Sequence, residues 1–288
     1  MELLKATQKN NYKISNQILN MKKLLFILLS SILLMSCAIN PYRKTDKIYK
    51  KQLKNLQTQI AERDTSLIDN NLISNFIGTT NFNLRKPNFV IIHHTAQDSV
   101  QQTIKTFTLV RTQVSAHYVI SDDGKIIQML NDYLRAWHGG SGTWGKNSDI
   151  NSTSIGIELD NNGVEPFSEP QIKSLVSLLT KLKKKYNIPS QNFIGHSDIA
   201  PTRKNDPSRL FPWKFLSENG FGFWQNTENA MAPITFDPEM GLQLIGYNTK
   251  DLTAAIKAFK LHYNQVEVDN ILDQKTIDLI YNIYKQQQ

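Results

Sequence analysis

Cysteine is almost absent from this 288-residue chain. Cys37 is the only one, so no disulfide within the chain can hold the fold together. Internal repeats are also absent. Hydrophobic residues make up 40% of the chain and charged residues 20%, which fits neither a disordered protein nor a membrane-spanning one. The length therefore predicts a globular protein with one sizeable domain and room for a smaller one.

A long hydrophobic run is missing as well. The apolar stretch Leu24–Met35 is too short to span a bilayer comfortably, and two lysines precede it, as in a secretory signal. It ends in "LMSC", which resembles the lipobox of bacterial lipoproteins and implies cleavage before Cys37 and lipidation of its thiol. A plain signal peptide that contains a cysteine is the alternative. Residues 1–20 precede this signal, and a start at Met21 also fits the pattern.

The excess of positive charge is small once the signal is removed. The whole chain has a formal charge of +8, and residues 1–36 carry five lysines and one glutamate, which leaves +4. No dense run of lysine or arginine lies near the candidate site. We therefore expect no nucleic-acid partner.

Composition divides the remaining chain into four segments. Residues 37–85 are rich in Lys, Asn and Gln and are predicted to be a lipidated tether, partly helical, with a partner-binding helix as the alternative. Residues 86–225 are expected to form the main domain, and residues 226–238 a proline-containing linker. Apolar residues at helical intervals over residues 239–288 predict a small three-helix domain.

Strand and helix patterns alternate within the main domain. Five short segments are typical of strands: "NFVIIHHTA", "AHYVIS", "KIIQML", "SIGIELD" and "NFIGH". An Asp-Asp-Gly turn joins the second and third as a hairpin. Ser168 is a predicted N-cap for a helix with apolar residues from Ile172 to Leu182. This order predicts an α/β fold, with a mixed central β-sheet flanked by helices.

Histidines are concentrated in the main domain, which holds five of the six. Four of these five lie at ends of predicted strands, where a sheet collects its site residues. Each one, taken singly, is more simply explained as structural. Together with Glu158 and Asp206 they favour a metal site, because zinc is commonly held by three such ligands. The five are His93, His94, His117, His138 and His196.

The stretch "HSDIAPTRKNDP" supplies partners for the first of these histidines. His196 and His93 converge if their strands are neighbours, and Asp206 returns on a loop that two prolines stiffen. Lys204 and Asp206 fall on the same side of an extended loop. An ammonium beside a metal-bound carboxylate stabilises a developing oxyanion. The alternative is that Lys204 and Asp206 are solvated loop residues.

Several motifs in the same order resemble those of the zinc-dependent N-acetylmuramoyl-L-alanine amidases (type 2 amidases), and within them the AmiD-like outer-membrane lipoprotein branch. These motifs are "VIIHHTA", "SAHYVI", "AWHGG", "SIGIELD" and "FIGHSDIAPTRKNDPSRLFPW", from about Asn88 to Trp213. The end of the chain resembles a peptidoglycan-binding three-helix domain. The resemblance implies a Zn²⁺ cofactor held by three ligands, namely His93, His196 and Asp206.

The resemblance also implies roles for neighbouring residues. Glu158 matches the general base, and Lys204 matches the residue that stabilises the oxyanion. His94 is expected to be a neighbour of the site rather than a ligand. Substrate contacts are expected from five residues, with a sheet histidine and core packing as alternatives for the first two: His117, Trp137, His138, Thr95 and Arg203.

Three functions are compatible with these residues. The first is a monomeric cell-wall amidase that acts on peptidoglycan or muropeptides, anchored through Cys37 to the outer membrane and facing the periplasm. The second is a non-catalytic muropeptide-binding protein, which is disfavoured because all three ligands, Glu158 and Lys204 are present. The third is an exported metal-dependent nuclease, which the low positive charge disfavours.

Overall fold

The computed structural model describes residues 21–23, 40–61, 84, 86–225 and 230–288. The chain consists of two units, residues 1–76 and residues 77–288. In the first unit, helix α2 (Arg43–Ala61) has no buried residue, and it confirms the helix expected in the tether segment. Cys37 and the apolar stretch before it lie outside the described residues. Among the described helices, none has the length and apolar character needed to cross a bilayer.

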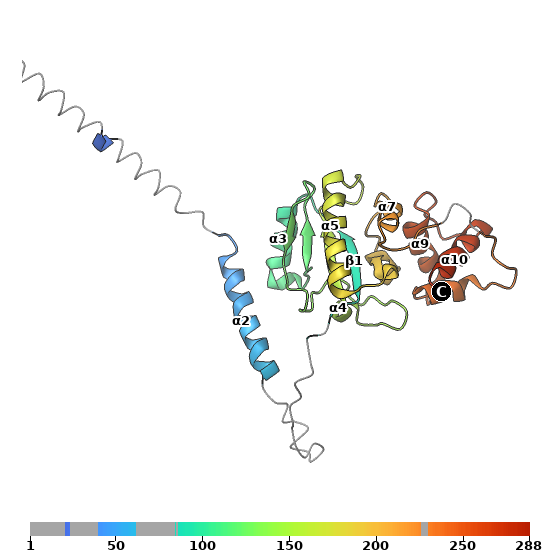
Figure 1. Cartoon of the computed structure of the whole chain (residues 1–288), viewed down its shortest axis with the longest axis horizontal. Coiled ribbons are helices and arrows are strands. Elements are labelled where there is room, and N and C mark those ends of the chain that lie inside the picture. Colours follow the sequence, from blue (N-terminus) through green and yellow to red (C-terminus); the bar gives the residue numbers. More distant parts are fainter. Residues whose placement is uncertain (1–20, 24–39, 62–83, 85, 226–229) are drawn as a thin grey trace, which may run out of the picture. The chain divides into compact units, whose positions relative to one another are not determined.

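A five-stranded sheet in the order β3-β2-β4-β1-β5 forms the centre of the second unit (Figure 1). Strand β3 is antiparallel to β2, and the other neighbouring strands are parallel. The predicted mixed sheet and its five strands are therefore confirmed. The strands are β1 (Phe89–His94), β2 (Tyr118–Ile120), β3 (Ile126–Gln128), β4 (Ser154–Leu159) and β5 (Phe193–Gly195).

Helices flank this sheet, and the longest of them, α5, begins as the sequence predicts. The Ser168 hydroxyl oxygen accepts a hydrogen bond from the Gln171 amide, and a proline occupies the first turn. The described helices of the second unit are α3 (Val100–Thr108), η1 (Val110–Thr112), α4 (Ile150–Thr153), α5 (Glu169–Tyr186), η2 (Ser190–Asn192), α6 (His196–Ile199), α7 (Trp213–Glu218), α8 (Pro238–Ile245), α9 (Leu252–Tyr263) and α10 (Gln274–Gln286).

The two faces of the sheet are covered by different parts of the chain. Side chains alternate between faces along a strand, so Val90 and Ile92 pack with the leucines of α5, while Ile91 points the other way. Ile91 and Ile194 share a second core with α8, α9 and α10. The C-terminal helices thus cover the face of the sheet that α5 leaves free.

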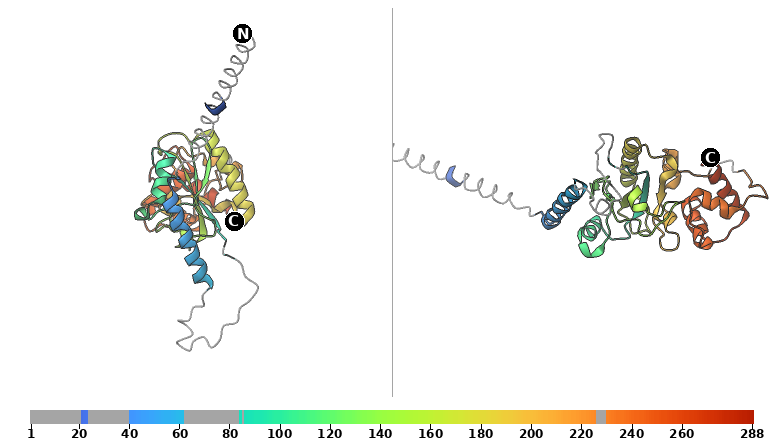
Figure 2. Two further views of the ribbon diagram at one scale, coloured as in Figure 1. Left: turned by 90° about the vertical axis from the view of Figure 1, so that its left-hand side faces the viewer. Right: turned by 90° about the horizontal axis from the view of Figure 1, so that it is seen from below.

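Three helices at the C-terminus confirm the predicted three-helix arrangement, but they do not stand apart from the sheet. The second core joins residues from before position 200 with Leu242, Phe259 and Ile280. Both Figure 1 and Figure 2 show these helices beside the sheet. The segment that leads to them is also attached, because the Ala230 amide donates to the Asn282 side chain on α10.

Candidate metal centre and active-site cleft

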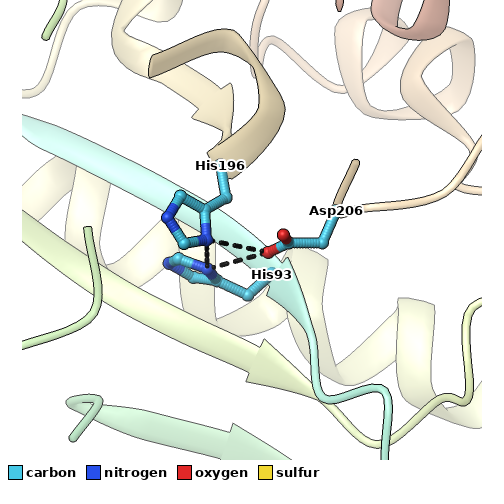
Figure 3. A group of neighbouring side chains, drawn as sticks. All are labelled: His93, His196 and Asp206. Atoms are coloured by element: carbon cyan, nitrogen blue, oxygen red, sulfur yellow. Dashed lines mark hydrogen bonds and ion pairs between the residues drawn. The ribbon is translucent and has the colours of Figure 1, made fainter. Parts of the chain in front are cut away.

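Two histidines and an aspartate from separate parts of the chain meet at the carboxyl edge of the sheet (Figure 3). His93 lies near the end of β1, and His196 follows β5 as the first residue of α6. Strands β1 and β5 are parallel neighbours, so their ends lie side by side. Asp206 comes from the loop after α6, and its carbonyl accepts a hydrogen bond from the Ser197 amide at 2.8 Å.

These three side chains, which we call the ligand cluster, are buried and touch one another. His93 Nδ1 lies 2.9 Å from His196 Nδ1 and 3.0 Å from Asp206 Oδ2. His196 Nδ1 lies 3.1 Å from the same carboxylate oxygen. Two imidazoles and one carboxylate that converge in this way form a donor set that can hold a divalent metal ion.

A chain of hydrogen bonds behind His93 fixes which of its nitrogens carries the proton. The Ser154 hydroxyl donates to the Ile150 carbonyl at 2.6 Å, so its oxygen accepts from His138 Nε2 at 3.1 Å. His138 Nδ1 then accepts from His93 Nε2 at 3.0 Å. Neutral His93 therefore presents an unprotonated Nδ1 to the ligand cluster, as a metal ligand must.

The charge states of the ligand cluster agree with this arrangement. Burial, reinforced by the unfavourable electrostatic effect of the neighbouring His196 imidazole, lowers the pKa of His93 to about 4, so the His93 ring is neutral at pH 7. Burial alone would raise the pKa of Asp206, but its contacts with the His196 and His93 imidazoles hold it below its ordinary value. The cluster thus combines a carboxylate with an imidazole lone pair, and these groups fit a divalent cation.

Glu158 is placed beside the ligand cluster by the register of the sheet. In the parallel pairing of β1 with β4, His93 lies opposite Glu158, and both side chains point to the same face. Glu158 Oε1 is 4.0 Å from His93 Nδ1. Burial, reinforced by the negative charge of Asp206, raises the pKa of Glu158 well above its usual range. A carboxyl group with a raised pKa is suited to exchanging protons near neutral pH.

Strand alternation also separates the two adjacent histidines of β1. His94 points away from the ligand cluster, and its Nδ1 accepts the Ser208 amide hydrogen at 3.1 Å. Its ring packs over Gly163, where an added Cβ would approach within 2.8 Å. His94 is thus a neighbour of the site, as expected, while the ligand cluster contains only His93 from this pair.

A cleft opens over the ligand cluster, and it is lined by Lys204 and by four of the five predicted substrate contacts, namely Thr95, Trp137, His138 and Arg203. Trp137 is 51% exposed, which rules out core packing as its role. His138 lines the cleft but is 7% exposed and is bonded to His93, so its main contact is with a ligand-cluster residue. Lys204 lies on the exposed rim beside buried Asp206.

The glycines of "AWHGG" allow Arg203 to approach the backbone. The Arg203 guanidinium donates to the Gly139 carbonyl at 3.3 Å. Gly140 has a φ of +56°, and an added Cβ would lie 3.2 Å from the guanidinium. Arg203 is therefore held over one wall of the cleft. Thr95 at the cleft is held in place by a hydrogen bond from its hydroxyl to the Asn161 carbonyl.

His117 is the one predicted contact that the structure contradicts. Its side chain is fully buried and lies outside the cleft lining. Nδ1 accepts the Gly156 amide hydrogen at 3.0 Å, and Nε2 donates to the Leu134 carbonyl at 2.9 Å. With both nitrogens bonded to backbone, His117 has no polar atom left for a substrate. The alternative interpretation, a hydrogen-bonded sheet histidine, is the correct one.

Comparison with known proteins matches residues 83–209 to the N-acetylmuramoyl-L-alanine amidase family model. The amidase AmiD of Escherichia coli K12 is 33% identical over 219 residues, which cover 65% of this chain and 78% of AmiD. The chain belongs to this amidase family. The anhydro-N-acetylmuramyl-L-alanine amidase AmpD of Haemophilus influenzae is 39% identical over 107 residues, which cover 36% of this chain and 58% of AmpD.

Two solved amidase structures share the fold over a longer part of the chain. E. coli AmiD in complex with the substrate anhydro-N-acetylmuramic acid-L-Ala-D-γ-Glu-L-Lys has a TM-score of 0.64 and 29% identity, covering 73% of this chain and 93% of that one. AmpDh3 of Pseudomonas aeruginosa has a TM-score of 0.65 and 26% identity, covering 73% and 96%. This chain is therefore an amidase of the same mixed α/β fold.

Sequence reasoning missed part of the amidase cleft. Phe107, from α3, and Val114, from the loop after η1, also line the cleft. No motif marks them, because apolar residues of a short helix look alike whether they face a core or a cleft. The sequence also assigned His138 to the substrate and did not predict its bond to His93. The available signal was Gly156, because a glycine inside a strand indicates that another group approaches the backbone closely. A Cβ atom added at Gly156 would lie 2.4 Å from the His138 ring.

Proposed function

We propose that this amidase hydrolyses the bond between N-acetylmuramic acid and L-alanine, in peptidoglycan or its fragments, with the help of a zinc ion. The observation that carries the proposal is the convergence of His93, His196 and Asp206 on the floor of a cleft, with Glu158 beside them. Support for the substrate comes from E. coli AmiD, whose structure contains an anhydromuramoyl tripeptide, and from family membership.

His93, His196 and Asp206 are the residues that would hold the cation. Three protein ligands leave a coordination position open, which is the pattern of catalytic rather than structural zinc sites. When bound, zinc lowers the pKa of a water ligand to about 7 and polarises a carbonyl oxygen. The buried, neutral state of His93 suits this role, because a protonated imidazole cannot bind metal.

Glu158 is proposed as the general base. Its carboxylate would accept a proton from the attacking water and deliver it to the nitrogen of the leaving alanine, so the proton count balances over one turnover. The carboxyl group stands 4.0 Å from His93 Nδ1, near the ligands without belonging to the ligand cluster. A carboxylate that exchanges protons must be free of firm metal coordination, and this separation supports the division of roles between Glu158 and Asp206.

Lys204 is proposed to stabilise the negative charge that develops on the carbonyl oxygen. It lines the cleft two residues before Asp206. Arg203, held by its bond to the Gly139 carbonyl, would meet carboxylates of the stem peptide. Trp137 offers an exposed aromatic face for the sugar, and Thr95 lies at the cleft floor as a further contact.

The wider organisation of the chain is proposed from its sequence pattern. Residues 1–36 would be removed as a signal, Cys37 would be lipidated, and residues 37–85 would tether a monomeric amidase domain (residues 86–225) to the outer membrane in the periplasm. Helix α2 buries none of its residues, which supports the tether. Residues 226–238 would connect to a peptidoglycan-binding domain at residues 239–288.

Mass spectrometry of a muropeptide digest tests the activity. Zinc-loaded protein is expected to release stem peptides that begin with L-alanine, together with the free sugar. Glu158→Gln should keep the metal, measured by elemental analysis, while turnover falls by about 10²–10⁴-fold. Intact muropeptides after incubation with zinc-loaded wild type would refute the enzymatic role and favour a muropeptide-binding protein. Loss of zinc from Glu158→Gln would refute the assignment of Glu158 as base.

A further inference from the structure

A second buried carboxylate lies close to the ligand cluster in the chain and has no role in the proposed reaction. Asp198 is fully buried, two residues after His196 in α6. Its Oδ2 accepts the amide hydrogen of Gly195 at 2.7 Å. Because Gly195 directly precedes His196, this bond holds the backbone where β5 passes into α6. Helix α6 has four residues, too few to be stable through its own hydrogen bonds, so it depends on such contacts.

The other two donors to Asp198 come from the C-terminal helices. The Tyr247 hydroxyl donates to Oδ1 at 2.6 Å, and His262 Nδ1 donates to Oδ2 at 2.7 Å. Tyr247 is 2% exposed and His262 is 1% exposed, so water cannot replace them. A buried carboxylate that loses a donor is strongly destabilised. The position of Asp198 therefore depends on Tyr247 and His262, which lie 49 and 64 positions further along the chain.

The donors are themselves held firmly against the sheet unit. The His262 ring stacks on Trp213 at a centroid distance of 3.8 Å and an interplanar angle of 18°. Next to Tyr247, the Gly246 carbonyl accepts the Gly145 amide hydrogen at 2.7 Å. Ile199 of α6 is buried in the core that α9 shares. The contact is thus continuous from the C-terminal helices to the segment that carries His196.

We propose that the C-terminal helical unit is a structural component of the metal centre, with Tyr247 and His262 acting as positioning residues. They hold Asp198, which holds the turn that aims His196 at His93 and Asp206. The unit would therefore tune metal affinity, in addition to any contact with the cell wall. The inference rests on the proposed role of the ligand cluster in binding metal.

Two substitutions of His262 in the full-length chain separate hydrogen bonding from packing. His262→Phe keeps an aromatic ring against Trp213 but has no donor. His262→Asn has no ring, but its amide nitrogen can take the place of Nδ1. Zinc affinity is measured by competition with a chromogenic chelator, and cobalt(II) absorption spectra report ligand geometry. We expect His262→Phe to bind zinc about tenfold more weakly with an altered cobalt spectrum, and His262→Asn to stay near wild type.

A matched control lies two residues away on α9. Lys260 is 1% exposed and pairs with Asp269 at 2.5 Å, without contact to Asp198. Lys260→Met should lower the stability of the helical unit and leave zinc affinity unchanged. Equal weakening in Lys260→Met and His262→Phe would show a general loosening and overturn the proposal. Normal affinity in His262→Phe, or a larger loss in His262→Asn, would overturn it as well.

Tyr247→Phe provides a milder version of the test, because it removes one hydroxyl and keeps the ring against Trp144. We expect zinc affinity to fall by about threefold to tenfold, since one of three donors to Asp198 is lost. Unchanged affinity in a folded Tyr247→Phe protein would contradict the proposal even if the His262 variants fail to fold. Failure of the wild type to bind zinc would refute the proposed function instead, so the two outcomes are distinguishable.

Discussion

Two buried clusters share the segment from His196 to Asp206, and both combine histidine with aspartate. In the cluster around Asp198, one carboxylate receives hydrogen bonds from Gly195, Tyr247 and His262, so acceptors and donors match. In the ligand cluster, an unprotonated imidazole nitrogen of His93 faces a carboxylate oxygen at 3.0 Å. The Asp198 carboxylate is satisfied by donors of the protein alone, whereas in the ligand cluster a nitrogen lone pair faces a carboxylate oxygen, an arrangement that a bound cation would stabilise.

This difference separates a structural polar cluster from a site better than burial does. Asp198 and Asp206 are both buried, are eight residues apart, and each contacts a histidine Nδ1. What distinguishes them is the number of donors that face each carboxylate. Buried polar groups without matching partners are costly, and a protein retains such groups where a ligand completes them.

Replacing each aspartate by asparagine should give opposite signatures. Asp206→Asn removes a ligand, so we expect zinc loss and a fall in kcat/KM of at least about 10³-fold, while the metal-free protein keeps its stability within about 1 kcal/mol. Asp198→Asn places an amide where three donors converge and should lower the free energy of unfolding by roughly 3–5 kcal/mol. Elemental analysis, turnover of muropeptides and urea unfolding measure the three quantities.

The two variants serve as controls for each other, since the chemical change is identical. Similar destabilisation in both would mean that the ligand cluster is as complete without metal as the Asp198 cluster. Retention of zinc by Asp206→Asn would remove Asp206 from the ligand set. Either result would break the distinction drawn between the two clusters.

The ligand cluster should also make the metal-free protein sensitive to acid. The pKa of His93 is about 4 in the fold against 6.5 ordinarily, mainly because of burial, so the unfolded chain binds more protons between these values. Stability is therefore complete above pH 6.5 and falls as the pH drops towards 4. One pKa unit corresponds to about 1.4 kcal/mol, so His93 contributes a loss of about 3 kcal/mol over this range.

Glu158 acts in the opposite direction and must be removed from the measurement. Its pKa is raised in the fold, so protonation favours the folded state as the pH falls. Urea unfolding of chelator-treated Glu158→Gln at pH 7 and pH 4.5 removes this opposing contribution. Adding His93→Asn to this variant should make the pH dependence shallower, while burial also lowers the pKa of His117 and of His138, which keep their own contribution. An equally steep dependence without His93 would assign the acid sensitivity to other groups.

The sequence predicts the scaffold of the site because strand patterns are local. The apolar run before His93 and the run "SIGIEL" before Asp160 are typical of buried strands, and the structure has a strand at each of these positions. The parallel register that sets Glu158 beside His93 is a long-range property, and the residues alone did not reveal it. The assignment of His93, Glu158 and Asp206 relied on resemblance to a family, and their proximity in the structure is compatible with it.

Partners far apart in the sequence were beyond prediction for the same reason. The donors to Asp198, Tyr247 and His262, lie in what the sequence presents as a separate helical domain. Helical periodicity identifies an apolar face without saying what covers it. For His117, a position at the end of a strand suggested the cleft. Hydrogen bonds of its ring with the Gly156 amide and the Leu134 carbonyl instead hold the side chain within the sheet.

Among the changes to the ligand cluster and its immediate support, the smallest expected effect comes from the serine behind His93. Ser154→Ala removes the hydroxyl that accepts from His138 Nε2, so His138 loses the bond that fixes its tautomer and orients it towards His93. Zinc affinity should fall by about tenfold, equal to about 1.4 kcal/mol, as for other residues that orient a metal ligand. Ser152→Ala is the control, since this exposed serine contacts Asp149 and leaves His138 untouched. Equal zinc affinity in the two variants would mean that His93 is held in place by its strand alone.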